Sequence, residues 1–188
     1  MYDVITAGSA TVDVFAKTRF SELIKIIDPK GETDLLAFPS GSKILIDELE
    51  FTTGGGGTNT AVALSRLGHK VGFIGKLGTG TNSDFIHKDL KKEKIDLLCS
   101  HGTGHSGYSV ILDTLEHDRT ILTYKGVNDE LKHDDIPYKK LKTKFKVMVT
   151  APLPMNVVEF VKNTQICVSI FREPNGRHQV PLNLDQVP

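Results

Sequence analysis

Residues 54–75, GGGGTNTAVALSRLGHKVGFIG, place four consecutive glycines before a segment with helical spacing and a short apolar run. Apolar residues recur within 61–67 as on one face of a helix, and Gly68 is a suitable helix stop because glycine tolerates left-handed backbone. Thr58 or Asn59 is expected to cap the start of this helix. The order of glycine loop, helix and strand predicts an α/β fold with a parallel sheet.

Segments on both sides of this stretch continue the alternation of short apolar runs and helical spacing. A first buried strand is expected at Val4–Ala7, and a second helix is expected to begin at Ser83 or Asp84. Residues 17–42 are expected to form a loop or an insertion, with a helical turn at 21–27. Further strands are expected at 43–46, 48–53, 71–75, 95–98, 108–112, 120–124 and 145–150.

The composition is that of an ordinary globular protein and argues against several classes of function. The 188 residues include 23 basic and 23 acidic side chains, and this zero net charge disfavours nucleic acid or an anionic membrane as the main partner. No apolar run reaches the roughly 18 residues that a membrane-spanning helix needs. Two cysteines make no disulfide framework and no signal peptide follows Met1, so a cytoplasmic protein is expected.

The four glycines could serve a ligand, or they could serve only as a hinge. Glycine lets backbone N–H groups approach a ligand closely, and a helix N-terminus favours phosphate or hydroxyl groups. The Walker pattern is absent, because Gly75-Lys76 is followed by Leu77 rather than by serine or threonine. The dinucleotide pattern G-x-G-x-x-G is also absent, because Asn59 or Thr60 stands where the last glycine is needed.

The segments 54–68 and 71–78 together resemble the N-terminal signature of the PfkB carbohydrate kinases, the ribokinase-like family. Four further features follow the family's order: Gly8 followed by Asp13, Ser106-Gly107 before an apolar run, a hairpin turn at 116–119, and Gly126-Val127-Asn128 in place of Gly-Ala-Asn. The resemblance covers residues 2–150. It implies a parallel sheet with flanking helices and a small β-sheet lid, whose strands would lie at about 43–53 and 108–124.

The resemblance also implies a binding site for a sugar or a nucleoside. Asp13 matches the family acid that accepts hydrogen bonds from substrate hydroxyls, a role that suits a carboxylate, although a capping or surface acid is the alternative. The backbone of Gly55, Gly56 and Gly57 matches the segment that contacts the substrate. Asn59 matches an asparagine that hydrogen-bonds the substrate, with a simple helix cap as the alternative.

The family reaction moves the γ-phosphate of ATP to a substrate hydroxyl with Mg²⁺, and Gly54 and Gly55 match the hinge about which the lid closes. The family's catalytic base and its phosphate-binding glycines lie in a later Asp-Thr-x-Gly-Ala-Gly-Asp motif. No such motif occurs here, and 151–154 lacks an acid often found after the preceding strand. We therefore expect no catalytic residue, no kinase activity of this chain alone, a missing C-terminal half, and a proline-rich segment 151–188 that is foreign to the fold.

Several other polar residues are expected to be structural. His101 and His105 lack the further ligands that a metal site needs, so no metal site is predicted. Cys99 is expected to be an inert small residue, and Asn128 a turn residue. The lysines within 139–146 are expected to form a solvated face rather than a site for a polyanion.

Two alternatives to a kinase fragment remain open. One is a non-catalytic module that binds a polyol or forms a homodimer through the lid, where the strands of 43–53 would offer an edge. The other is a remnant that does not fold stably, because an incomplete sheet exposes apolar surface.

Overall fold

The computed structural model describes residues 1–113, 119–141 and 147–149 of the chain. Residue contacts divide the chain into two compact units. Unit 1 comprises Met1–Val12, Thr53–Gly107 and the described part of Lys125–Pro188, and unit 2 comprises Asp13–Thr52 and Tyr108–Tyr124. The chain therefore passes between the units at four places, after Val12, Thr52, Gly107 and Tyr124.

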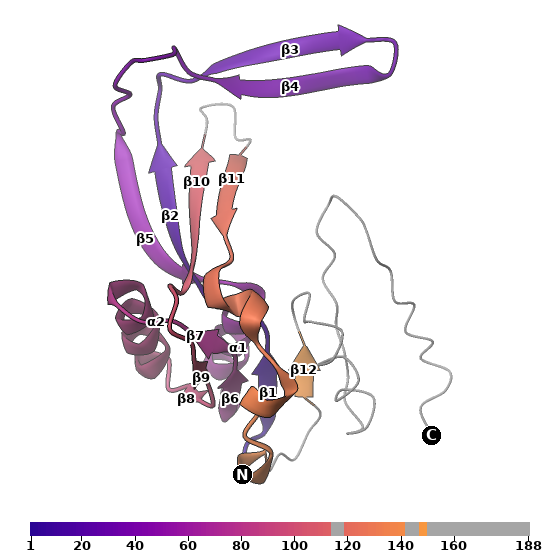
Figure 1. Cartoon of the computed structure of the whole chain (residues 1–188), viewed down its shortest axis with the longest axis vertical. Coiled ribbons are helices and arrows are strands. Elements are labelled where there is room, and N and C mark those ends of the chain that lie inside the picture. Colours follow the sequence, from indigo (N-terminus) through magenta and orange to yellow (C-terminus); the bar gives the residue numbers. More distant parts are fainter. Residues whose placement is uncertain (114–118, 142–146, 150–188) are drawn as a thin grey trace. The chain divides into compact units, whose positions relative to one another are not determined.

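Unit 1 contains a parallel sheet with the strand order β12-β1-β6-β8 (Figure 1). Its strands are β1 (Val4–Ala7), β6 (Val71–Ile74), β8 (Asp96–Leu97) and β12 (Val147–Val149). Each neighbouring pair runs parallel, and every residue of β1 and β6 is buried. Such fully buried, mostly apolar strands are typical of parallel sheets covered on both faces. The predicted α/β fold and its first strand are confirmed.

Two helices pack beside this sheet, α1 directly before β6 and α2 directly before β8, and both begin earlier than predicted. Helix α1 (Gly56–Arg66) contacts β1 and β6, and α2 (Thr81–Lys92) contacts β8. Their N-caps are Gly55 and Gly80, neither with a side-chain capping bond, so the predicted caps at residues 58–59 and 83–84 are wrong. The hydroxyl of Thr58 instead donates to two carbonyl oxygens of residues that precede the helix, Gly54 at 2.5 Å and Gly55 at 2.9 Å.

The C-terminal ends of the two helices are tied to each other. The Arg66 guanidinium binds both carboxylate oxygens of Glu93, at 3.0 and 2.6 Å, and holds the pKa of that acid below its ordinary value. The Ser65 hydroxyl donates to the Glu93 carbonyl at 2.6 Å. Gly68 ends α1 with a φ of +92°, which confirms the predicted helix stop.

A second sheet has the order β11-β10-β2-β5, with strands β2 (Thr11–Lys17), β5 (Glu48–Gly54), β10 (Gly107–Asp113) and β11 (Arg119–Tyr124). Strands β10 and β11 pair antiparallel, with Tyr108 opposite Tyr124. The predicted strand at 48–53 and the pairing of the predicted strands 108–112 and 120–124 are therefore confirmed, whereas residues 116–118 of the predicted turn lie outside the described residues. The predicted strand at 43–46 is wrong, because these residues form no strand. In this segment the Leu45 carbonyl accepts a hydrogen bond from the Thr18 hydroxyl at 2.7 Å.

Residues predicted to form a loop with a helical turn instead form an antiparallel hairpin of β3 (Glu22–Asp28) and β4 (Gly31–Ala37). Runs of isoleucine and leucine favour strands, and the turn between them is set locally. The Lys30 N–H donates to the Asp28 carboxylate at 2.7 Å, and Gly31 has a φ of +138°. These two strands pair only with each other among the described strands.

The remaining elements are short. They are the parallel pair β7 (Lys76–Leu77) and β9 (Ser100–His101), and the 3₁₀ helices η1 (Gly126–Glu130), η2 (His133–Asp135) and η3 (Tyr138–Lys140). The predicted boundary at residue 150, the segment 151–188 and the lysines of 142–146 lie outside the described residues. No helix in the described part of the chain is long and apolar enough to cross a membrane.

Candidate functional site

The glycine run packs directly on the segment that follows the central strand. A Cβ atom added at Gly57 would lie 2.8 Å from the Gly8 Cα and 2.7 Å from the Phe73 ring. A Cβ at Gly55 would lie against the Ser9 carbonyl and 2.9 Å from the Ala10 Cα, and the φ of Gly55 is +105°. Close approach between two backbones thus explains why these two positions are glycine.

Ser9 satisfies the N-terminal N–H groups of α1 from a distant part of the sequence. Its hydroxyl accepts from the Gly56 N–H at 3.2 Å, and its carbonyl accepts from the N–H groups of Gly57 at 3.2 Å and Thr58 at 3.4 Å. A helix start normally leaves such donors free for a cap or an anion. Here they are used within the protein, so this helix start is not a free phosphate cradle.

The residues predicted to bind substrate divide between the two units. Unit 1 brings together the glycine run and Asn59, whose side chain is exposed in the early part of α1. Asp13 belongs to unit 2, where it is partly exposed on β2. The boundary between the units falls after Thr52, two residues before the predicted hinge at Gly54.

Asn128 is predicted to be a turn residue, but its side chain also binds a segment that is distant in the sequence. Its Oδ1 accepts the Ala10 N–H at 3.0 Å, while its Nδ2 donates to the carbonyls of Ala10 at 3.0 Å and Lys125 at 2.9 Å. Ser9 and Ala10 are therefore held by two different partners, the start of α1 and the side chain of Asn128. The sequence analysis missed both roles, and the only signal was the small residues that precede and follow Ser9.

Lys76 and Asp135 form a largely buried ion pair in unit 1. Their charged atoms lie 3.0 Å apart, with 12% and 21% of the two side chains exposed. Burial alone would raise the pKa of Asp135, but the Lys132 N–H and the Lys76 ammonium outweigh it and hold the pKa below its ordinary value. Because Lys76 also donates to the Glu130 carbonyl at 3.2 Å, this pair fixes the segment after η1.

Cys99 has the surroundings of an unreactive thiol. Burial raises its pKa to about 12, and its sulfur lies 3.9 Å from the Phe73 carbonyl oxygen. A thiol is nucleophilic only as the thiolate, so this residue is no candidate nucleophile at neutral pH.

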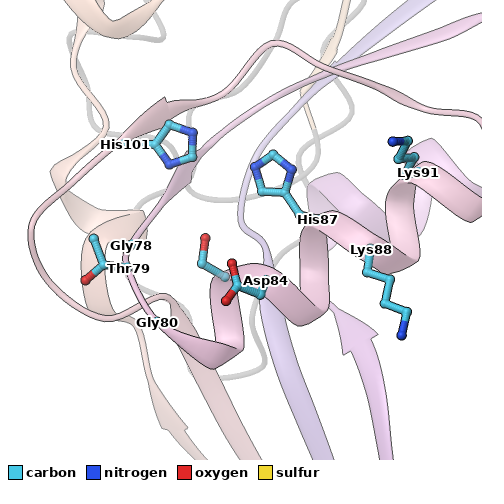
Figure 2. Close-up of a pocket in the computed structure, with 9 residues that line it drawn as sticks. Gly78, Thr79, Gly80, Asp84, His87, Lys88, Lys91 and His101 are labelled. Carbon is cyan, nitrogen blue, oxygen red and sulfur yellow. The ribbon is translucent and has the colours of Figure 1, made fainter.

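A hollow of about 650 Å³ lies beside the start of α2 (Figure 2). The loop 78–80, Asp84 and His87 line it together with His101, whose ring stacks on that of His87 with centroids 5.7 Å apart. His105, which lies four residues after His101 in the sequence, is not among the residues that line the hollow. Carboxylate and cationic side chains both line the hollow, and within the described ranges no group of three metal-ligand residues occurs.

The geometry of glycine run, helix and strand agrees with a comparison against known families. The sequence pattern of the pfkB family carbohydrate kinases matches residues 22–151, which is more than half of the chain. The chain belongs to the pfkB family of carbohydrate kinases. The predicted family and its ribokinase-like fold are therefore confirmed.

Three relatives of this pfkB-family chain carry names of sugar kinases. The uncharacterized sugar kinase YegV of Escherichia coli is 28% identical over 128 residues, which are 68% of this chain and 35% of that protein. Ribokinase of Staphylococcus aureus is 31% identical over 99 residues, or 51% of this chain and 33% of the relative. The 5-dehydro-2-deoxygluconokinase of Clostridium perfringens is 36% identical over 104 residues, or 52% and 30%. The matched segment spans about a third of each relative.

Solved structures show the same fold. Ribokinase of Thermotoga maritima superposes with a TM-score of 0.71 at 20% identity, covering 90% of this chain and 52% of that one. Ribokinase of Arabidopsis thaliana, complexed with ribose and ATP, gives a TM-score of 0.65 at 17% identity and covers 90% and 53%. The pfkB-family chain therefore spans about half the length of these structures.

Proposed function

We propose that this chain forms the substrate-binding part of a pfkB-type sugar or nucleoside kinase, a cytoplasmic enzyme that transfers the γ-phosphate of ATP to a substrate hydroxyl. The family match over residues 22–151 carries this proposal, since that range includes the glycine run and Asn59. In the proposed site Asp13 accepts hydrogen bonds from substrate hydroxyls, and the exposed amide of Asn59 binds a further hydroxyl. Gly54 and Gly55 serve in the proposal as the hinge about which the lid closes.

The glycines of this site act in the proposal by shaping the start of α1 and not by donating hydrogen bonds to a ligand. The N–H groups of Gly56 and Gly57 donate to Ser9, so they are not free to bind a ligand. Gly55 has a left-handed backbone at the helix start, and the absence of a Cβ there lets the chain lie against Ser9 and Ala10. Ligand selectivity then depends on the side chains of Asp13 and Asn59.

ATP and Mg²⁺ do not fit the described residues as a built site. The donors at the start of α1 are used by Ser9, and the part of the chain that the structure covers holds no group of three acids, histidines or cysteines suited to a metal. We therefore assign neither group to a residue of this chain. The proposal concerns the binding of the phosphate acceptor.

Binding of the acceptor is tested by thermal unfolding of the 188-residue chain with a panel of sugars and nucleosides. A ligand at a hundred times its Kd stabilises the folded chain by about 2.7 kcal/mol. We expect Asp13→Ala to weaken that ligand by about tenfold to a hundredfold, because hydrogen bonds to a charged group are worth about 1.5–3 kcal/mol. Asn59→Ala is expected to weaken it by about threefold to tenfold.

Asn82→Ala is the matched control, because Asn82 lies in the first turn of the other helix. It should leave the ligand-induced shift unchanged. The proposal is wrong if no polyhydroxyl compound stabilises the chain, or if the shift survives in both Asp13→Ala and Asn59→Ala.

We further propose that unit 2 pairs with a second copy of the chain through the hairpin β3–β4. All seven residues of β3 are exposed, and its apolar side chains lie on both faces, with Leu23, Ile24, Ile26 and Ile27 exposed by 45–72%. An isolated two-stranded hairpin is marginally stable at best in water. Exposed apolar surface of this kind marks an interface, and a second copy offers a self-complementary partner.

Self-association is expected to disappear when Ile24 and Ile26 are both replaced by lysine, because two charges would then face the apolar surface of the partner. Sedimentation velocity across a wide range of protein concentration measures the change from dimer to monomer. Asp34→Lys, on the same hairpin, removes no apolar surface and should remain dimeric. A wild-type chain that is monomeric at every concentration rules this proposal out.

A further inference from the structure

Asn128 lies where the chain passes between its two units. Three of the four passages occur after Val12, Gly107 and Tyr124. The side chain of Asn128 bonds to Ala10, two residues before the first of these passages, and to Lys125, directly after the last. One amide group thus touches chain segments that are more than a hundred residues apart.

The amide binds Ala10 in the manner of a neighbouring strand. It accepts from the Ala10 N–H and donates to the Ala10 carbonyl, both at 3.0 Å, so both backbone groups of one residue are paired, as in a β-ladder. Ala10 is fully buried, and a buried peptide group without a partner is costly. A carboxamide suits this pairing because it offers a donor and an acceptor side by side on one planar group.

The same amide also packs against Gly107, after which the chain leaves unit 1 again. A Cβ atom added at Gly107 would collide with Nδ2 of Asn128 and lie 3.0 Å from the Ala10 carbonyl oxygen. The backbone beside Asn128 is also fixed, because the buried Val127 donates its N–H to the His105 carbonyl at 3.0 Å. The side chain therefore projects from an anchored turn into a space that fits it closely.

We propose that Asn128 is a positioning residue that holds together three segments of unit 1, at the points where the chain leaves or re-enters that unit. The fourth passage, after Thr52, leads into the glycine run, which Ser9 holds separately. Since Ser9 and Ala10 are adjacent, the two attachments meet at one point of the chain. This inference goes beyond the proposed function, because it concerns contacts within unit 1 and requires no ligand.

Hydrogen exchange at individual amides tests the proposal in the complete 188-residue chain. Asn128→Asp keeps an acceptor for the Ala10 N–H but turns an oxygen toward two carbonyls. We expect exchange at Ala10 and in the first residues of β2 and β10 to rise at least about tenfold, while exchange in β1 and β6 stays unchanged. Asp129→Ala is the matched control from the same 3₁₀ helix, and it should change neither region.

Gly107→Ala gives a second variant for the same measurement, because its added methyl group would displace the amide from the other side. The same amides should exchange faster in Gly107→Ala and stay protected in Asp129→Ala. The proposal is overturned if exchange rises equally throughout unit 1, if it does not rise at Ala10 and in the first residues of β2 and β10, or if neither variant folds.

Discussion

Gly57→Ala is expected to destabilise the chain by about 2–3 kcal/mol, although alanine ordinarily favours a helix over glycine by about 1 kcal/mol. Gly57 lies in the first turn of α1, where its missing side chain lets the helix touch the end of β1. An added Cβ would lie 2.8 Å from the Gly8 Cα, 2.9 Å from the Gly8 carbonyl carbon and 2.7 Å from the Phe73 ring. Backbone and a fully buried ring cannot move aside without shifting the helix from the sheet.

Urea unfolding of the 188-residue chain measures this effect, and Ala63→Gly is the matched control. Ala63 is exposed on the same helix, so its replacement should cost only the helix preference of about 1 kcal/mol. Gly57→Ala adds a methyl group and Ala63→Gly removes one, yet both are expected to destabilise the folded chain. A Gly57→Ala chain that is more stable than the wild type would show that the close contact with Gly8 and Phe73 is wrong.

The expected loss at Gly57 bears on how a glycine run is interpreted. The sequence allows either a ligand or a hinge at these four residues, and the structure adds a third reason, which is contact between α1 and the end of β1. The same contact lets Ser9 reach three N–H groups of the helix. A glycine run before a helix therefore predicts close backbone approach, and other evidence must decide whether the neighbour is a ligand or the protein.

Elements defined by their own residues could be predicted from the sequence. The strand Val4–Ala7, the hairpin of β10 and β11 and the end of α1 at Gly68 were all visible as apolar runs, turns or a stop. The helix starts could not be placed, because the donors of α1 are satisfied by Ser9, 47 residues earlier in the chain than Gly56. Local capping preferences contain no information about such a distant partner.

The hairpin β3–β4 and the role of Asn128 escaped prediction for different physical reasons. The hairpin exposes apolar residues on both faces, so it lacks the alternation of apolar and polar residues that marks a half-buried strand. Asn128 pairs with Ala10 at a separation of 118 residues, and no sequence pattern near either residue indicates this contact. Among the candidate site residues, Asp13 and Asn59 remain predictions from the family resemblance.

The 188-residue chain is expected to transfer no phosphate from ATP to any sugar or nucleoside, even to one that it binds. Phosphoryl transfer depends on positioning and on electrostatic stabilisation of the moving phosphate, and the family places these groups in the Asp-Thr-x-Gly-Ala-Gly-Asp motif. That motif does not occur in these residues. The start of α1 cannot substitute for it, because its donors are engaged by Ser9.

Transfer of labelled γ-phosphate to the compounds that stabilise the chain measures this prediction, with the Staphylococcus aureus ribokinase as the positive control. A trace of contaminating kinase would give the same product in wild type and in Asp13→Ala, whereas activity of this chain would fall in the variant. Product above the protein-free background that falls in Asp13→Ala would contradict the prediction. Binding without transfer, by contrast, would show that recognition of the acceptor and transfer of the phosphate are separable, because the proposed recognition residues all precede residue 60.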